Sequence, residues 1–263
     1  EDPRNTERVW HKLFWDFNQR ARTGIVAEAQ GGVDMALWDI KAQAAGMPLW
    51  QLLGGAQDRI KVYATVNGPD YTEEEYVRVA MQKVAAGHRT IKIAVAVGGI
   101  DDLEDDVRKV RAIREAVGPN IGLAIDANCL LDLQGAARLA RRVEEYDIAW
   151  FEEPVHNNEP SLTAQLRRMT SIPISAGQCE SFKWNFRDLI AGGDAYDLMQ
   201  VDLVYAGGYT EAAKVAALLQ AHHLQFSTHG SPILSMHLVG GFANGKTVEC
   251  HLMPEGIDRT VFT

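Results

Sequence analysis

The sequence predicts an α/β fold in which eight parallel strands close into a barrel, with seven helices between them in a (β/α)7β order. Three observations support this prediction. The chain has 263 residues, close to the usual length of one such barrel. Short runs rich in β-branched residues alternate with amphipathic helical patterns along most of it. No glycine-rich dinucleotide-binding turn follows the first strand, which disfavours an open sheet and leaves a TIM-type barrel.

The chain opens with two helical stretches before this alternation begins. We expect helices over residues 6–21 and 25–45. The second has apolar residues at helical spacing and ends where Gly46 and Pro48 stop a helix. We therefore assign residues 1–56 to a helical lead-in and residues 57–263 to the barrel.

The alternation that follows supplies the elements of the barrel in order. Strands are expected at residues 62–66, 90–95, 122–126, 149–152, 172–176, 198–202, 225–228 and 247–251. Helices are expected between them at residues 73–86, 102–117, 134–146, 159–170, 184–191, 210–222 and 233–243. In such barrels the carboxyl ends of the strands meet on one face, where the active site lies.

The composition excludes several classes of partner. The net charge is −9 and no cluster of Lys and Arg stands out, so we expect no nucleic acid and no membrane as partners. No apolar run approaches the roughly 20 residues of a membrane span. The start of the chain is not a signal peptide, and three distant cysteines indicate a reducing compartment, so we expect a cytoplasmic protein.

Oxygen-bearing side chains recur at the ends of three successive strands. Asp126 ends the third strand, Glu152 ends the fourth, and Gln178 follows the fifth. Asp126 and Glu152 are 26 residues apart, as are Glu152 and Gln178, so one strand–helix unit separates each from the next. Two carboxylates and an amide oxygen at one height match the coordination that Mg²⁺ takes. The sequence therefore predicts a magnesium site at this face.

The remaining strands carry candidate catalytic residues. Asp202 ends the sixth strand, His229 follows the seventh, and Glu249 lies in the eighth. An Asp and a His on adjacent strands can hydrogen-bond, which fixes the imidazole tautomer and suits a general base. Lys92 lies in an apolar second strand and is expected to point into the barrel, where a nearby divalent cation would lower its pKa.

The three cysteines each follow a polar residue that is expected to point inward. If strand alternation persists there, Cys129, Cys179 and Cys250 face the helix layer as inert packing. A catalytic thiol is the alternative.

The motifs that contain these residues resemble the mandelate racemase and muconate-lactonizing branch of the enolase superfamily. GGVDMALWDIKAQAAGMPLWQLLGG at residues 31–55 looks like the signature helix of that branch, and IDAN, WFEEPV, IPISAGQ, VDLVYAGGYTEA and STHG follow in family order. The resemblance implies a magnesium enzyme that removes the proton next to a carboxylate. It further implies a small carboxylate substrate and a homo-oligomer.

Carried over position by position, the resemblance also assigns roles. Asp126, Glu152 and Gln178 match the metal ligands, and Asp202 with His229 matches the base dyad. Glu249 matches the acid that hydrogen-bonds the substrate carboxylate as it becomes an enediolate.

Two positions depart from the family pattern. The third ligand is normally an acid and here is Gln178, although Glu180 has the same strand parity and could replace it if the strand end bends. The second strand normally carries two lysines, and Ala94 stands at the position of the basic one. A racemase with a base on each face of the carbanion would lack one base here. We therefore expect dehydration of a sugar acid to a 2-keto-3-deoxy acid, with Lys92 polarising the carboxylate.

Other readings remain open at this point. One is a racemase or epimerase of a 2-hydroxy acid, and another is a barrel retained as a non-catalytic binding module. A phosphate-binding barrel isomerase is disfavoured because THGSPIL and HLMPEG lack a glycine-rich cradle. The family's α+β capping domain, which selects the substrate, is expected to be largely missing from this chain. Residues that could line the mouth of the barrel are His156, Tyr205, Ser231 and His251.

Overall fold

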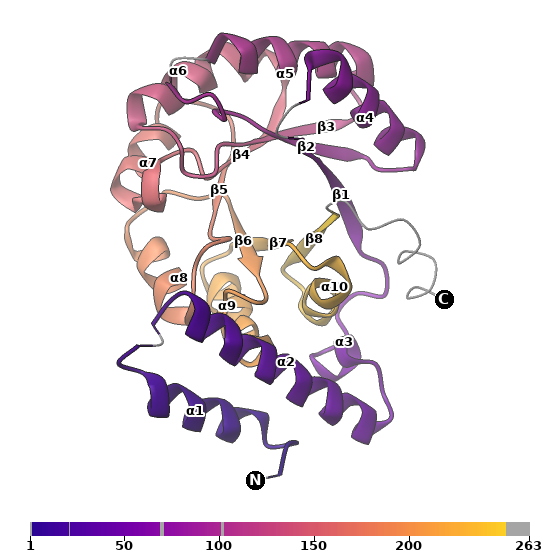
Figure 1. Ribbon diagram of the computed structural model, residues 1–263, viewed down its shortest axis with the longest axis vertical. Coiled ribbons are helices and arrows are strands. Elements are labelled where there is room, and N and C mark those ends of the chain that lie inside the picture. The colour runs from indigo at the N-terminus through magenta and orange to yellow at the C-terminus, as the bar shows by residue number, and fades with distance from the viewer. Residues whose placement is uncertain (1, 21, 69–70, 101–102, 251–263) are drawn as a thin grey trace.

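The described residues form a closed barrel of parallel strands. The computed structural model describes residues 2–20, 22–68, 71–100 and 103–250. Each strand pairs with its neighbours in sequence, and β1 also pairs with β8, which closes the barrel. Figure 1 shows the helices as a ring outside the strands. The predicted fold class is confirmed.

All the predicted strands are present, and their ends differ from the prediction by at most two residues. They are β1 Lys61–Val66, β2 Thr90–Ala94, β3 Gly122–Asp126, β4 Ile148–Glu152, β5 Ile174–Ala176, β6 Leu198–Asp202, β7 Gln225–His229 and β8 Gly245–Cys250. Residue 251, the last of the predicted eighth strand, lies outside the described residues. The most consequential difference is β5, which is only three residues long.

The barrel helices also follow the predicted order. They are α4 Glu73–Ala85, α5 Leu103–Val117, α6 Leu133–Val143, α7 Pro160–Arg167, α8 Phe182–Ala191, α9 Tyr209–Ala221 and α10 Pro232–Gly241, with short 3-10 turns η2 Glu144–Tyr146 and η3 His156–Asn158. Side-chain caps explain two of the starts. Thr72 and Glu75 form a capping box at α4, and Asp132 accepts from the Gly135 N–H at 2.7 Å at α6.

Two longer helices and one short one precede the barrel. They are α1 Thr6–Phe17, α2 Ile25–Ala45 and α3 Leu49–Leu52. The first is shorter than predicted and the third was not predicted. In Figure 1, α1 and α2 lie side by side beyond α9 and α10, on one side of the ring. Within the described part of the chain, no helix is long and apolar enough to cross a membrane.

Strand alternation separates two layers of side chains. On β2, Ile91 and Ile93 pack outward in the large apolar core between strands and helices. A smaller cluster fills the inside of the barrel and comprises Tyr63, Ala124, Trp150 and Leu198. Lys92 has the opposite parity to its isoleucine neighbours and is therefore directed into this interior. This apolar cluster lies beneath the polar residues at the carboxyl ends of the strands.

A buried aspartate attaches α2 to the barrel. Asp34 accepts hydrogen bonds from the Thr210 N–H at 2.8 Å and the Thr210 hydroxyl at 2.6 Å, at the first turn of α9. A Cβ at Gly208, where φ is +87°, would lie 2.5 Å from the Asp34 carboxylate. A Cβ at Gly31 would lie 2.6 Å from the Val204 carbonyl. The close approach of α2 to the β6–α9 loop therefore requires these glycines.

Asp34 gives a testable dependence of stability on pH. Burial raises the pKa of Asp34 to about 6, above the ordinary 3.8, despite the hydrogen bonds from Thr210. A raised folded pKa means that this group contributes stability at low pH that is lost as pH rises from roughly 4 through 6. We expect Asp34→Asn, which cannot ionise, to melt higher than the unmodified protein at neutral pH, with the difference vanishing near pH 4. If the melting temperatures of the two proteins differ by the same amount at every pH across this range, the assignment is wrong.

Candidate active site

One ammonium lies among three carboxylates inside the barrel. Lys92 is 1% exposed, and its Nζ lies 3.0 Å from Asp126, 2.6 Å from Glu152 and 3.0 Å from Glu249. These side chains come from β2, β3, β4 and β8. With every group ionised, the cluster carries one positive and three negative charges. A buried excess of negative charge is costly unless protons or a cation offset it.

The pKa values of Glu152 and Lys92 in this cluster both depart from their ordinary values. Burial raises the pKa of Glu152 to about 8, and although Lys92 opposes this, Asp126 and Glu249 add to it. Burial disfavours the charged form of Lys92, but the surrounding carboxylates outweigh it and raise the Lys92 pKa well above its ordinary value. The lowering expected for Lys92 beside a bound divalent cation stays a prediction. Three acids surround this amine, so it stays an ammonium.

Glu152 is held by donors on both oxygens. Its Oε1 accepts from Lys92, and its Oε2 accepts from the Trp150 indole and the Gln200 amide, each at 2.8 Å. The register pairs Asp126 with Glu152 on neighbouring strands, at the same height. Trp150 and Gln200 were missed from the sequence. Each lies two residues before a candidate residue, so strand parity could have found both.

Gln178 follows β5 in a turn, and its amide is oriented by acceptors. The NH₂ group donates to Glu153 Oε2 at 2.9 Å and to Asn128 Oδ1 at 3.2 Å. Its Oε1 is buried and has no hydrogen-bond partner among the described residues. Within the same residues, no set of three or more His, Cys, Asp and Glu side chains forms a metal site. A metal site that includes Gln178 would use this amide oxygen beside the carboxylates of Asp126 and Glu152.

Glu180, the alternative third ligand, stays a prediction. β5 ends at Ala176, so the strand alternation on which its predicted parity rested does not extend to it. Glu180 is half-buried and interacts with Asn158 and Asn185.

Asp202 and His229 form the predicted pair. They are partners in the β6–β7 register, and His229 Nδ1 lies 2.8 Å from Asp202 Oδ2. The other Asp202 oxygen accepts from the Val204 and Tyr205 N–H groups at 2.7 and 3.0 Å, which fixes the carboxylate. An ionised Asp202 accepts from Nδ1–H, so Nε2 is the basic nitrogen of the neutral ring. That nitrogen lies 4.0 Å from Glu249 Oε2.

His229 is the accessible member of the group, with a side chain 25% exposed. Burial disfavours its charged form, but the hydrogen bond to Asp202 and the charge of Glu249 outweigh it, so its pKa lies above the ordinary value. Glu249 is fully buried and accepts from Lys92, from the Thr65 hydroxyl and from the Gly230 N–H at 3.1 Å. Thr65 was also missed from the sequence.

The cysteines do not form a reactive centre. All three are free thiols, and Cys179 is exposed, so its predicted packing against the helix layer is wrong because β5 ends before it. Although the residue is exposed, partial loss of solvent around its sulfur, together with the nearby Glu153 and Glu180 charges, raises the Cys179 pKa to about 12. A protonated thiol is a poor nucleophile at neutral pH.

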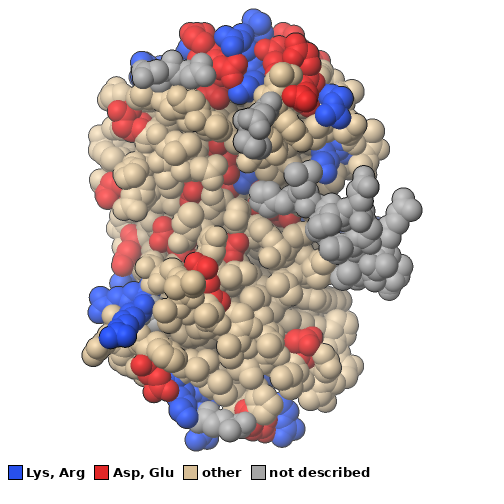
Figure 2. All heavy atoms as spheres, in the orientation of Figure 1, with Lys and Arg blue, Asp and Glu red and all other residues tan. Residues whose placement is uncertain are grey.

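The residues expected at the mouth are only partly placed. His156 and Ser231 are exposed after β4 and β7, and Tyr205 is half-buried after β6. His251 lies outside the described residues. On the face shown in Figure 2, acidic side chains are scattered and basic ones lie mostly toward the two ends.

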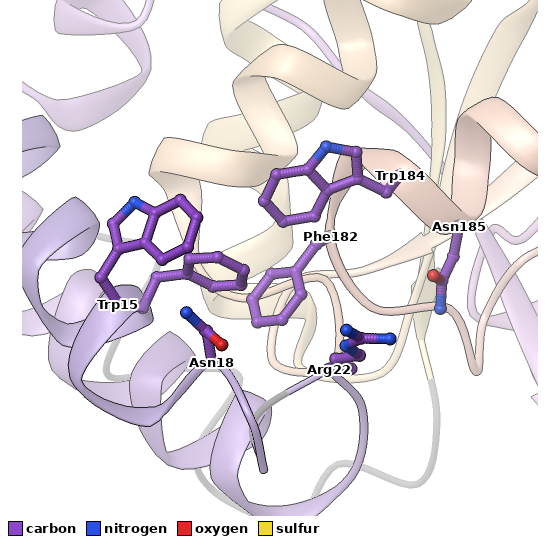
Figure 3. A pocket seen from close by; sticks show the side chains of 7 residues that line it. Trp15, Asn18, Arg22, Phe182, Trp184 and Asn185 are labelled. Carbon is purple, nitrogen blue, oxygen red and sulfur yellow. The ribbon is translucent and has the colours of Figure 1, made fainter.

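A separate cavity of about 380 Å³ lies between α1 and the start of α8. Figure 3 shows the rings of Trp15, Phe182 and Trp184 around it, with Arg22 and Asn185 at one side. None of the predicted site residues lines this cavity. This cavity is therefore separate from the cluster of charged residues at the strand ends.

Comparison with known proteins places these features in a family. Residues 75–263 match the family model described as enolase C-terminal domain-like. Residues 2–54 match the N-terminal domain of mandelate racemase and muconate lactonizing enzyme. The chain belongs to the mandelate racemase/muconate lactonizing enzyme family. The resemblance stated from the sequence motifs is confirmed.

Members of this family with related sequences act on sugar acids by name. The chain is 32% identical to a 3,6-anhydro-α-L-galactonate cycloisomerase of Streptomyces coelicolor, over 95% of this chain and 68% of that protein. It is 29% identical to an arabinonate dehydratase of Saccharolobus solfataricus, over 100% of this chain and 71% of that protein. A solved family structure, a racemase from Streptomyces coelicolor with bound magnesium, superposes with a TM-score of 0.90 at 31% identity, covering 95% of this chain and 74% of that one.

The Asp202–His229 contact can be tested without any substrate. Because Asp202 raises the pKa of His229 and burial lowers it, Asp202→Asn should shift the imidazole titration to lower pH. NMR titration of the histidine ring, assigned by its loss in His229→Asn, measures this shift. Asp194→Asn, which removes an exposed partner of Arg167, is the matched control and should leave the titration unchanged. A His229 titration that is the same in Asp202→Asn would refute the pairing.

Proposed function

We propose that this protein is a magnesium-dependent enzyme that removes a proton alpha to a carboxylate, and that its reaction is the dehydration of a sugar acid to a 2-keto-3-deoxy acid. The observation that carries the proposal is the oriented Asp202–His229 pair beside the buried Lys92 cluster, at the carboxyl ends of the strands. A base and a cluster of charged groups on one face are the two parts that this chemistry needs.

The donor set fits a magnesium ion. Asp126 and Glu152 supply carboxylates that both contact one ammonium, and Gln178 offers a buried amide oxygen with no hydrogen-bond partner among the described residues. Oxygen donors of this kind suit Mg²⁺, and a divalent charge would offset the excess of carboxylates. These three residues would hold the ion. When bound, the ion supplies positive charge that stabilises an enediolate. The related racemase with bound magnesium supports this choice of metal.

His229 supplies the base. Its Nε2 takes the alpha proton, and the electron pair of the broken C–H bond moves into the carboxylate to give the enediolate. Asp202 keeps the proton on Nδ1 and favours the imidazolium that forms, consistent with the raised pKa of His229. Lys92 is an ammonium donor in this cluster and stabilises negative charge developing on the substrate carboxylate.

The elimination can use the same imidazolium. Its Nε2–H protonates the beta hydroxyl, the C–O bond breaks, and water leaves as the enediolate electrons form a C=C bond. The resulting enol tautomerises to the 2-keto-3-deoxy acid, so the reaction loses water and needs no oxidant. One base on one face therefore suffices for a syn elimination.

The opposite face of the site explains why racemisation is the alternative and not the choice. Ala94 pairs with Asp126 in the β2–β3 register and is buried, so this position of β2 supplies no base. A racemase or epimerase would need a second proton donor on that side. Glu249 accepts hydrogen bonds from three donors, as an ionised carboxylate does. Its role as the acid that hydrogen-bonds the substrate carboxylate stays a prediction. The cytoplasmic location and the homo-oligomer also stay predictions.

Isotope exchange separates these outcomes. In D₂O with Mg²⁺, screening acid sugars should yield a 2-keto-3-deoxy acid, read by NMR and by a keto-acid assay. His229→Asn should lower turnover by about a hundredfold to ten-thousandfold, the usual contribution of a general base, while Mg²⁺ affinity stays the same. Substrate that exchanges its alpha proton and inverts, without keto acid, would reject dehydration in favour of racemisation.

A further inference from the structure

Glu153 lies directly behind the third proposed ligand. It is 1% exposed and has a φ of +41°, which turns its side chain away from the path of β4. Its Oε2 accepts from the Gln178 amide at 2.9 Å, and its Oε1 accepts from the Asn158 amide at 2.9 Å. The buried carboxylate thus has a donor on each oxygen, and one of them is the proposed ligand.

The contact determines which end of the Gln178 amide faces which way. A carboxylate only accepts hydrogen bonds, so the side of Gln178 that meets Glu153 must be its NH₂ group. Asn128 Oδ1, 3.2 Å away, accepts from the same nitrogen. The amide oxygen is therefore directed away from Glu153, and it is the buried atom with no hydrogen-bond partner among the described residues.

The surroundings hold Glu153 in this position. Its N–H donates to the Ser175 carbonyl at 2.9 Å, and its carbonyl accepts from the Cys129 N–H at 2.9 Å. Asn158, which donates to the carboxylate, is itself fixed because its carbonyl accepts from the Tyr196 hydroxyl at 2.7 Å. The loops after β3 and β4, together with β5, therefore fix one carboxylate that contacts a buried amide.

We infer that Glu153 is a positioning residue of the magnesium site, which directs the Gln178 oxygen to the ion and supplies the negative charge that this ligand position lacks. The inference rests on the proposed function, because it requires Mg²⁺ at Asp126, Glu152 and Gln178. A carboxylate hydrogen-bonded to the amide NH₂ increases the negative charge on the amide oxygen, and in a buried site its own charge also attracts the cation. The carboxylate then lies behind the ligand and does not itself contact the ion. The total charge near the ion is the same as it would be with an acid at the third ligand position.

Exchanging the two groups tests this inference. We compare the unmodified protein with Glu153→Gln, Gln178→Glu and the double variant, by Mg²⁺ titration calorimetry and by melting in EDTA. Glu153→Gln should weaken Mg²⁺ binding by about tenfold or more, as is usual when a group behind a ligand is changed. Gln178→Glu places two carboxylates in contact, so it should melt lower in EDTA and recover with Mg²⁺. The double variant restores one acid and one amide, and should regain both the EDTA melting temperature and most of the affinity.

An exposed acid away from these contacts provides the matched control. Glu115, in the last turn of α5, pairs with Arg111 on the surface, so Glu115→Gln should leave Mg²⁺ affinity unchanged. The inference would be overturned if Glu153→Gln bound Mg²⁺ with unchanged affinity, or if the double variant melted no higher in EDTA than Gln178→Glu. Either result would leave the proposed function standing. An unmodified protein that binds no Mg²⁺ would overturn the proposed function, and this inference with it.

Discussion

The site is organised around the ammonium of Lys92, which is shared by Asp126, Glu152 and Glu249 in the interior of the barrel. Its Nζ lies 2.6–3.0 Å from all three carboxylates, and all four groups are buried. A single positive charge cannot balance three negative charges in a low-dielectric interior. Burial, with the charges of Asp126 and Glu249, raises the pKa of Glu152. A divalent cation bound here would offset the excess negative charge, and this electrostatic attraction would favour its binding.

Backbone strain lies at the same strand ends as the chemistry. Asn128 after β3, Glu153 after β4 and Ser231 after β7 all have positive φ, at 45°, 41° and 30°. Such conformations are costly for residues other than glycine, and they persist where the surrounding contacts fix them. Here Asn128 and Glu153 both accept from the Gln178 amide, so the strained turns orient a proposed ligand.

The regular parts of this arrangement were predictable from the sequence, because they follow from repetition. One strand–helix unit between Asp126 and Glu152 places them at one height, and the register pairs them as expected. Asp202 and His229 likewise meet because neighbouring parallel strands end together. Strand parity alone correctly directs Lys92 inward.

The irregular parts were not predictable in the same way. β5 stops at Ala176, after which a turn replaces alternation, so the predicted orientation of Cys179 was wrong and strand parity does not extend to Glu180. Lys92 gained a raised pKa because three acids surround it, a tertiary effect that no local pattern contains. Glu153 follows the proposed ligand Glu152 in the chain, and its hydrogen bond with Gln178 goes with a positive φ that the sequence does not reveal.

The most direct test of the account is whether this carboxylate cluster binds a divalent ion at all. Titration calorimetry with Mg²⁺ should show one binding site in the unmodified protein, and Asp126→Ala should abolish it, because this change removes one of the two proposed carboxylate ligands. No measurable binding, or binding that survives in Asp126→Ala, would contradict the central claim.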